Sequence, residues 1–296
     1  MEPQVYAEFV ESLGHTVREA NGVYWYNIFS HAWISFPLET QLSPAEVDVE
    51  RILRGERGGI VRYCSRVEDG APGFRHVVSG SGYGLQSLEP NARNKTRQGL
   101  SKCVCGPADG SEIASEGIDL HAETLIRQGR RLPAGYREYW QRYFKAVSAC
   151  PAATVWSCRY EGQLVAFLIS FRIGAVENIC IVRSSAELLR HRPNNALLFT
   201  FLQQALQRSG TAEVCIGLQS LQPHMSSLDV FKRGMGFVEQ PIGQRIEVRG
   251  PLGIGVPRTL ARIAGSVAGR LSGEYAARLA GALEVYGSQP RVRRVA

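Results

Sequence analysis

The chain has 296 residues, of which 44% are hydrophobic and 21% charged, and its formal net charge is +7. This composition is typical of a globular protein with a sizeable core, and it excludes a disordered or collagen-like chain. No apolar run reaches the roughly 20 residues that cross a bilayer. The first residues, Met-Glu-Pro-Gln, lack the basic and apolar regions of a secretion signal, so we expect a cytoplasmic protein.

The positive charge is concentrated at the C-terminal end. From residue 251 onward seven Arg stand against two Glu, which is +5 of the total of +7. The basic residues elsewhere are not interleaved with aromatic ones, so an RNA-binding protein is a weak interpretation. The seven cysteines lie mostly in apolar patterns, which favours reduced thiols in a reducing cytoplasm.

The first third of the chain predicts both helices and strands. Aromatic and β-branched residues predict paired strands over 23–29 and 32–36. Ser43-Pro44-Ala45-Glu46 is typical of a helix start, and we expect that helix to run to Arg54. Further expected elements are a helix over 5–13, a strand over 60–64 and a loop over 69–73.

The aromatic side chains of the two predicted strands allow two interpretations. Core packing is the main interpretation of Trp25, Trp33 and Phe36, and the wall of a substrate pocket is the alternative. A phosphate-binding loop at Gly80-Ser81-Gly82 is disfavoured, because no strand-to-helix context with a third glycine follows.

A basic segment over residues 91–102 is the clearest polar signal in the first half. Arg93, Arg97 and Lys102 can share one side of a helix, with Lys95 close by. A solvated helix face is one interpretation, and a cationic clamp for phosphate or carboxylate is the other. Cys103 and Cys105 are too closely spaced for a structural zinc pair, so we expect no metal site.

The middle and second half of the chain predict alternating elements. Apolar patterns predict helices over 118–128 and 135–147, and strands over 155–160, 164–173 and 178–182. An apolar stripe predicts a helix over 194–208, with Pro193 in its first turn and Gly210 past its end. Strands over 214–218 and 244–248 and a short helix over 227–233 complete the pattern, in which 178–218 reads as a βαβ unit.

These elements and their closing motif resemble a known family. The order of elements, the Leu-rich helix and the run from Leu228 to Phe237, with its Phe-Lys followed by Gly-Phe, resemble the GNAT acyltransferase domain. More closely, they resemble its Fem-type branch, whose members transfer aminoacyl or acyl groups to cell-envelope and polysaccharide precursors. The likeness covers about a third of the chain well.

The resemblance implies an α/β (α+β) fold of GNAT type, with a mixed twisted sheet flanked by helices. It implies a degenerate GNAT-like half over residues 1–130, an intact half over 131–250 and a basic helical tail over 251–296. In the family two neighbouring parallel strands part, and the exposed backbone of one holds the acyl donor. Here those strands are residues 178–182 and 214–218.

Candidate site residues lie near the expected parted strands, on the basic segment and on the closing motif, where Phe231 and Lys232 match the family's motif residue by residue. The catalytic candidates are Lys232, His191 and Asp229. Candidates for binding substrate or donor are Arg93, Lys95, Arg97, Asn178, Arg190, Arg192, Asn194, Asn195 and Phe231. Each has an ordinary alternative; Asp229, for example, could cap its helix or pair with Arg233.

The segment before the long helix departs from the usual coenzyme A pattern. Ordinary members have a Gly-rich turn there whose amides cradle the pyrophosphate, whereas Pro193 supplies no N–H. We therefore expect either acyl-CoA or aminoacyl-tRNA as the donor substrate, with no tightly bound cofactor and with tRNA as the carrier in the second case.

The function expected is transfer of an acyl or aminoacyl group to an amine or hydroxyl, without a covalent enzyme intermediate. The acceptor would be a small molecule or a glycan or peptide precursor for the cell envelope or a polysaccharide. The alternative is a non-catalytic GNAT-like binding module of an envelope or polysaccharide assembly system. Residues 251–296 either pack on the body or make a peripheral contact with the inner membrane surface.

Overall fold

The structure is a computed structural model that describes residues 2–127, 131–219, 226–250, 257 and 274–291. The chain forms two compact units, each built from non-contiguous segments. Unit 1 comprises residues 1–13, 76–217 and 227–239, and unit 2 comprises residues 14–75, 218–226 and 240–296. The predicted division at residues 130 and 250 stays a prediction.

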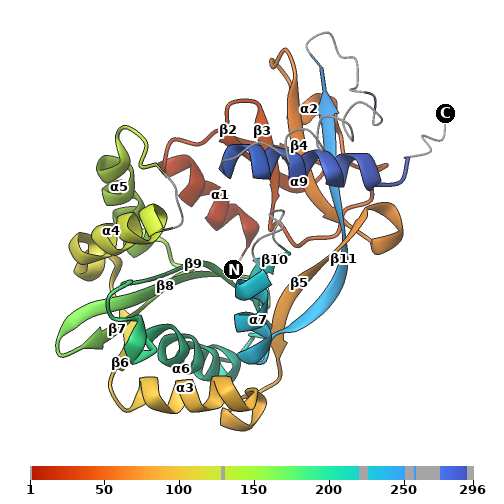
Figure 1. The fold of residues 1–296 in the computed structure, drawn as a ribbon. Coiled ribbons are helices and arrows are strands. Elements are labelled where there is room, and N and C mark those ends of the chain that lie inside the picture. The colour runs from red at the N-terminus through yellow and green to blue at the C-terminus, as the bar shows by residue number, and fades with distance from the viewer. Residues whose placement is uncertain (1, 128–130, 220–225, 251–256, 258–273, 292–296) are drawn as a thin grey trace. The chain divides into compact units, whose positions relative to one another are not determined.

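Unit 1 is built on a mixed sheet (Figure 1). Its strands follow the order β10-β9-β8-β7-β6. All neighbours are antiparallel except β9 and β10, which run parallel. The β7–β8 turn contains Glu161 at φ 50° and Gly162 at φ 81°, the positive φ values that a two-residue hairpin turn requires. The bounds are β6 Val104–Ala108, β7 Ala153–Tyr160, β8 Gln163–Ile173, β9 Val176–Ser184 and β10 Glu213–Leu218.

Helices cover both faces of this sheet (Figure 1). On one face Phe201 of α6 packs against Trp156 of β7, with ring centroids 5.8 Å apart. On the other face Phe144 of α5 packs against Phe167 of β8 at 5.6 Å. Successive side chains of a strand point to opposite faces, so the almost wholly apolar β8 is buried on both. The helices are α1 Pro3–Ser12, α3 Pro90–Leu100, α4 Gly110–Arg127, α5 Tyr136–Ala149, α6 Pro193–Gln207 and α7 Ser226–Gly234.

In unit 2 the strands of the sheet follow the order β1-β2-β3-β4-β11. β3 and β4 run parallel, and the other pairs are antiparallel. Trp25, Trp33 and Tyr63 are each about 1% exposed and form its core, which confirms core packing for the two tryptophans. The elements are β1 Val17–Ala20, β2 Val23–Phe29, β3 Ala32–Phe36, α2 Val49–Ile52, β4 Gly59–Ser65, β5 Ala71–Ser79, β11 Val238–Arg249 and α9 Glu274–Ser288.

The helix α9 lies within the basic helical tail expected over residues 251–296, and its C-terminal end is anchored on β11. Just past α9, the side chain of Gln289 accepts from the backbone N–H of Ile246 at 2.9 Å and donates to the carbonyl of Ile246 at 2.8 Å. Tyr286 packs on Ile246 in the same place. Residues 251–256 and 258–273 of the expected tail lie outside the described residues.

Several predicted boundaries were wrong. No helix starts at Ser43: that segment is a turn, and the short α2 begins later, with the Asp48 side chain accepting from the Arg51 N–H. A capping pattern alone does not form a helix unless an apolar stripe follows that can pack. The segment 69–73 is not all loop, since β5 begins at Ala71. α4 begins at Gly110, β11 extends well beyond residues 244–248 on both sides, and β1 and β6 were not predicted.

None of the helices that the structure describes is both long and apolar enough to cross a membrane. All seven cysteines are free thiols.

A close approach of α3 to α6 generates a stability prediction. A Cβ placed on Gly99 would lie 2.6 Å from the carbonyl oxygen of Arg192 and 3.0 Å from the Cβ of Ala196. Gly99→Ala should therefore push the two helices apart and destabilise the protein by about 1–3 kcal/mol, measured by urea unfolding. Gly106→Ala is the matched control, since its Cβ would meet nothing within 4 Å. Equal stability of the two variants would contradict the close packing.

Candidate functional site

The two predicted site strands lie side by side and then separate. β9 and β10 pair in parallel at only three positions, the last of which joins Asn178 to Cys215. β9 continues to Ser184 and β10 to Leu218 without further pairing between them. The prediction that these strands part is confirmed. Beyond Asn178 the backbone groups on the facing edges can bind a ligand in place of a neighbouring strand.

A β-bulge accounts for the separation. In the pairing of β8 with β9, Ile169 lies opposite Ile181 and Ser170 lies opposite Ile179, so Cys180 is an extra residue. A bulge bends its strand and increases its twist, and this one directly follows the last β9–β10 pair. In β10, Gly217 has φ 85°, a left-handed conformation that redirects the end of that strand. Both strands therefore deviate where they part.

The helix α6 starts where β9 ends. Asn194 donates from Nδ2 to the Ser184 hydroxyl at 3.0 Å, which ties the helix start to the end of β9. Arg192 precedes the helix at φ 59°, and its carbonyl accepts from the N–H groups of Asn195 and Ala196. The Asn194 Oδ1 and Arg192 Nε atoms are buried without a partner. These polar atoms at a helix N-terminus favour an anion or a polar ligand group.

His191 is held in one orientation beside the helix start. Its ring stacks on Tyr160 with centroids 4.2 Å apart and 14° between the planes. Arg190 Nε donates to His191 Nε2 at 3.2 Å, which places the proton of the neutral ring on Nδ1. Burial, and then the nearby Lys102 and Arg190, lower the pKa of His191. The imidazole is therefore neutral near pH 7.

A buried charge cluster joins α7 to β5. The Asp229 Oδ1 atom accepts from His76 Nε2 at 2.9 Å and lies 3.6 Å from the Nζ of Lys232. His76 is fully buried and Lys232 is 5% exposed. Burial lowers the pKa of Lys232, and the charges of Asp229 and then of Cys215 oppose that shift. Cys215 is the β10 residue of the last β9–β10 pair.

The sequence did not reveal His76. Burial, followed by the charge of Lys232, lowers the pKa of His76 to about 4, so it is a neutral donor to Asp229. A lone histidine in an apolar strand carries no signal for a partner 153 residues away. Asp229 does not pair with Arg233, which instead contacts Glu239 at 2.7 Å.

The closing motif forms the end of α7. The Phe237 N–H donates to the carbonyl of Lys232, and Gly236 has φ 89°, which together make a left-handed helix end. Asn195 donates from Nδ2 to the Met235 sulfur at 3.3 Å and so connects α6 to this motif. Phe231 is partly buried against the same core. The motif thus fixes Lys232 relative to α6.

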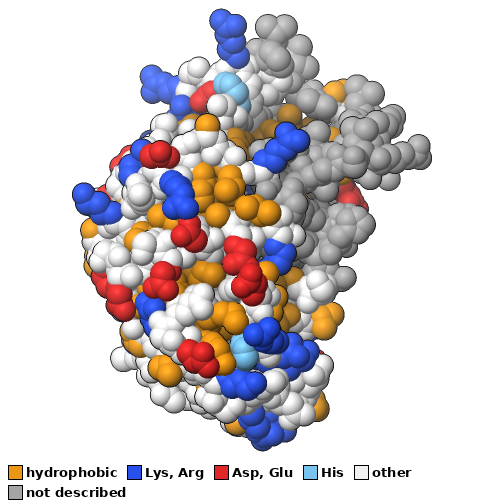
Figure 2. All heavy atoms as spheres, turned by 60° about the vertical axis from the view of Figure 1, so that its left-hand side comes forward, with side chains coloured by type: hydrophobic (Ala, Val, Ile, Leu, Met, Phe, Trp, Pro, Cys, Tyr) orange, Lys and Arg blue, Asp and Glu red, His pale blue; other side chains and the backbone are white. Residues whose placement is uncertain are grey.

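The basic helix α3 uses its predicted cations in different ways. Arg93 donates to the backbone carbonyls of Leu85 at 2.9 Å and Leu88 at 3.0 Å, which anchors the preceding loop. Lys95 is partly exposed and Arg97 is exposed. Figure 2 shows Lys and Arg side chains gathered at the lower end of the molecule, where Figure 1 draws α3. Substrate contacts of these three residues stay a prediction.

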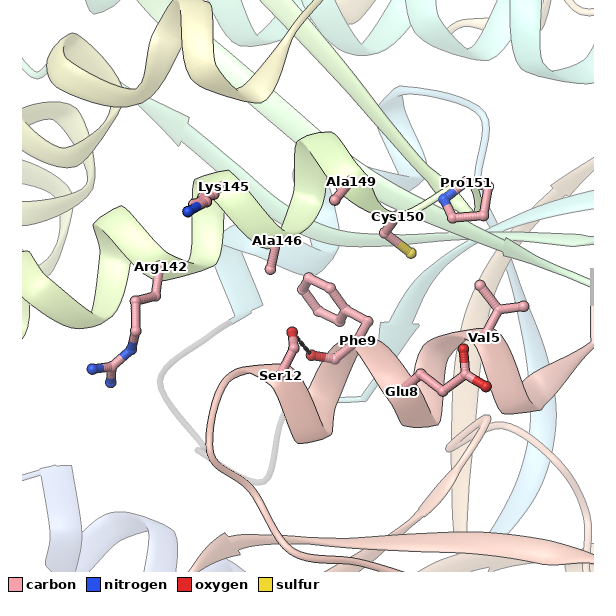
Figure 3. Close-up of a pocket in the computed structure, with 10 residues that line it drawn as sticks. All are labelled: Val5, Glu8, Phe9, Ser12, Arg142, Lys145, Ala146, Ala149, Cys150 and Pro151. Atoms are coloured by element: carbon pink, nitrogen blue, oxygen red, sulfur yellow. Dashed lines mark hydrogen bonds between the residues drawn. The ribbon is translucent and has the colours of Figure 1, made fainter.

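Two further features complete the description of this region. A cavity of about 550 Å³ lies between α1 and α5 (Figure 3), and none of the predicted site residues lines it.

Among the residues that the structure describes, no cluster of three His, Cys, Asp or Glu side chains could hold a metal. His224, a histidine near the closing motif, lies outside the described residues.

Comparison with known proteins places this geometry in context. The family model of the acetyltransferase (GNAT) domain matches residues 90–220. The crystal structure of FemX is similar in fold, with a TM-score of 0.56 and 10% identity over 80% of this chain and 90% of that one. L-PGS from Bacillus licheniformis gives a TM-score of 0.53 and 16% identity over 88% of this chain and 95% of that one. No curated protein matches the chain.

The buried histidine generates a pH prediction. The folded-state pKa of His76, about 4, lies below the ordinary 6.5, so the unfolded chain binds the proton more tightly. The neutral state of His76 therefore adds to the free energy of unfolding. This contribution is fully present above pH 6.5 and is lost as the pH falls toward 4. Between pH 7 and pH 5 the wild type should lose about 2 kcal/mol more than His76→Gln, measured by urea unfolding. The same loss in both proteins would show that His76 is protonated in the folded state.

Proposed function

We propose that this protein is an acyltransferase that acts on cell-envelope or polysaccharide precursors, because residues 90–220 match the model of the acetyltransferase (GNAT) domain. The group transferred is acyl or aminoacyl, and the acceptor is an amine or hydroxyl of a small molecule, a glycan or a peptide. The observation that carries the proposal is the early end of the β9–β10 pairing. The Fem-type fold supports this acceptor class.

The chemistry is direct transfer. The donor carbonyl lies between the separated strands, where backbone N–H groups stabilise the negative charge that develops on its oxygen. The acceptor nitrogen or oxygen forms a bond to the carbonyl carbon, and the bond to the donor's sulfur or oxygen then breaks. The acceptor gives up one proton to a base and the leaving group takes one from an acid, so the net change is one proton moved from the acceptor to the leaving group; exchange with water then restores both protein groups. No enzyme nucleophile is needed, since holding the reactants together supplies much of the rate.

Lys232 has the central role in this proposal. Its partly desolvated ammonium stabilises the developing charge and protonates the leaving group, because burial lowers the pKa of this side chain. Asp229 is a positioning residue, since it holds both Lys232 and His76. The neutral His191 at the start of α6 is the candidate acceptor of the nucleophile's proton, through Nε2 after Arg190 moves away.

The residues at the start of α6 indicate which molecule carries the acyl group to the site. Pro193 provides no N–H, and α3 packs against the Arg192 carbonyl, so a pyrophosphate cradle of backbone amides is not supported. Side chains of Arg190, Arg192 and Lys95 can instead contact a phosphate. This arrangement favours aminoacyl-tRNA over acyl-CoA as the donor, while Asn178, at the last β9–β10 pair, can contact the acyl group through its buried Nδ2 atom.

A test of the donor uses the folded protein alone. A ligand that binds only the folded state raises its melting temperature. We expect aminoacyl-tRNA to raise the melting temperature of this protein more than acetyl-CoA does at equal concentration. A shift with acetyl-CoA alone would reject the tRNA donor and retain the acyltransferase. No shift with either, and no transfer of the acyl group from either, would reject both donors.

Replacement of Lys232 tests the chemistry. Lys232→Met should lower kcat by about 100-fold, because the charge that develops in the transition state loses a stabilising cation. Circular dichroism should show that the fold is retained. Arg233→Gln, the adjacent residue on the exposed side of α7, is the matched control and should keep wild-type turnover. Wild-type rates for Lys232→Met would remove this lysine from the mechanism.

A further inference from the structure

Three cysteine thiols of unit 1 lie together. Cys105 is in β6, the last strand in the order of the sheet, and it lies directly opposite Cys158 of β7. Cys103 is two residues before Cys105, in the segment between α3 and β6. The Cys158 thiol is hydrogen-bonded to the thiols of both Cys105 and Cys103. The thiol cluster of Cys103, Cys105 and Cys158 therefore has Cys158 at its centre.

The strand pairing fits the geometry of a disulfide. Residues directly opposite each other in an antiparallel pair have Cα atoms about 4.5 or 5.5 Å apart, and their side chains point to the same face of the sheet. Both separations lie within the range of about 4.4–6.8 Å that disulfides span. A bond between Cys105 and Cys158 therefore needs little movement of the backbone.

The thiol of Cys105 is the one within the cluster that meets solvent. It is half-buried, whereas Cys103 is 6% and Cys158 0% exposed. The hydrogen bond with Cys105, and then burial, raise the pKa of Cys158, so this thiol is protonated near pH 7. An oxidant dissolved in water therefore reacts first at Cys105. Cys158 follows despite its raised pKa, because contact between the two groups gives a high effective concentration.

Cys103 is held by a second partner. Its Sγ atom donates to the backbone carbonyl of His191 at 3.8 Å. Burial raises the pKa of this thiol, which keeps it protonated and able to donate. Cys105, by contrast, is placed against Cys158 by the strand register. The first bond to form is therefore that between Cys105 and Cys158, with Cys103 as a third thiol that can exchange with it.

We propose that Cys105 and Cys158 are a modification site at which a low-molecular-weight disulfide, such as oxidised glutathione, installs a reversible protein disulfide. The Cys105 thiol loses its proton and attacks one sulfur of the small disulfide, which forms a mixed disulfide and releases one small thiolate. Cys158 then loses its proton, attacks the Cys105 sulfur and expels the second small thiolate. The two protons pass through solvent to the released thiolates, so two protein thiols are oxidised and one small disulfide is reduced.

Formation of the bond is measured without turnover, by mass spectrometry. The folded full chain is incubated with oxidised glutathione near neutral pH, free thiols are blocked with iodoacetamide, and the protein is digested with trypsin without reduction. Trypsin leaves Cys103 and Cys105 on one peptide and Cys150 and Cys158 on another, so fragmentation assigns the linked pair. We expect Cys105 joined to Cys158, and release of the two peptides by dithiothreitol. Glutathione on the exposed Cys180, with no link between these peptides, would overturn the proposal.

Replacement of the central thiol tests the assignment. Cys158→Ala should abolish every link between the two peptides, because both other thiols of the cluster contact Cys158. Alanine is small and apolar, so it suits this buried position, and circular dichroism checks the fold. Cys150→Ala, on the same tryptic peptide, is the matched control and should keep the wild-type yield. A link that persists in Cys158→Ala would assign the bond to Cys150 and reject the thiol cluster.

The order of reaction is tested at the other two cysteines, in variants that keep Cys158. Cys105→Ser should slow the formation of a link to Cys158 by about tenfold or more, because Cys103 is buried and held by the His191 carbonyl. Cys103→Ser should form the bond at about the wild-type rate. The opposite result, fast oxidation without Cys105, would make Cys103 the reactive thiol and reject the proposed pair.

The stability of the oxidised protein separates a disulfide of the folded state from one formed in unfolded chains. A bond between residues 105 and 158 closes a long loop and restricts the unfolded chain. The oxidised wild type should therefore melt about 5 °C or more above the reduced protein, and oxidised Cys158→Ala should show no such rise. A lower melting temperature of the oxidised wild type would show that the bond strains β6 and β7, and it would overturn the proposal.

Discussion

The structure depends on two parallel strands that stop pairing after three residues. The bulge at Cys180 and the left-handed Gly217 turn β9 and β10 apart just where the last pair forms. A sheet gives up backbone hydrogen bonds at such a point, and unpaired backbone groups away from water are costly unless a ligand binds them. In the proposed function the gap holds the donor, and it leaves backbone groups of β9 and β10 without partners in the neighbouring strand. It is retained because β8, buried on both faces, holds β9 from its other side.

The rest of unit 1 positions charged groups around this gap. The start of α6 is tied to the end of β9 by Asn194, and the closing motif is tied to α6 by Asn195. The carboxylate of Asp229 accepts a hydrogen bond from the neutral His76 and pairs with the partly desolvated Lys232. Because the burial of Lys232 is only partly offset by Asp229, its proton is held less tightly than that of an exposed lysine. In unit 2, among the described residues, the Arg62 side chain donates to the amide oxygen of Gln244 and to no carboxylate.

Much of the fold was predictable from the chain. The strand–helix–strand unit at β9, α6 and β10 follows from apolar periodicity, Pro193 and Gly210, and the parting of its strands from the family resemblance. Local sequence patterns did not predict the elements whose structure depends on packing against the rest of the fold. The capping pattern at Ser43 forms only a turn, and β1 and β6 are edge strands too short to show a period. Neither His76 nor Arg62 could be identified, because their partners are distant in sequence.

The sequence alone indicated the α/β fold class of the protein. The evidence consists of local patterns, which can be recognised in the sequence without a structure. They are the apolar periodicities, the long apolar helix and the Phe-Lys motif at Phe231 and Lys232. The tertiary structure decided which charges are compensated. Asp229 meets His76 across 153 residues, and Arg62 meets Gln244 across 182. Long-range contacts of this kind arise only when strands assemble into a sheet, because register and burial then set each side chain's neighbours and its proton affinity.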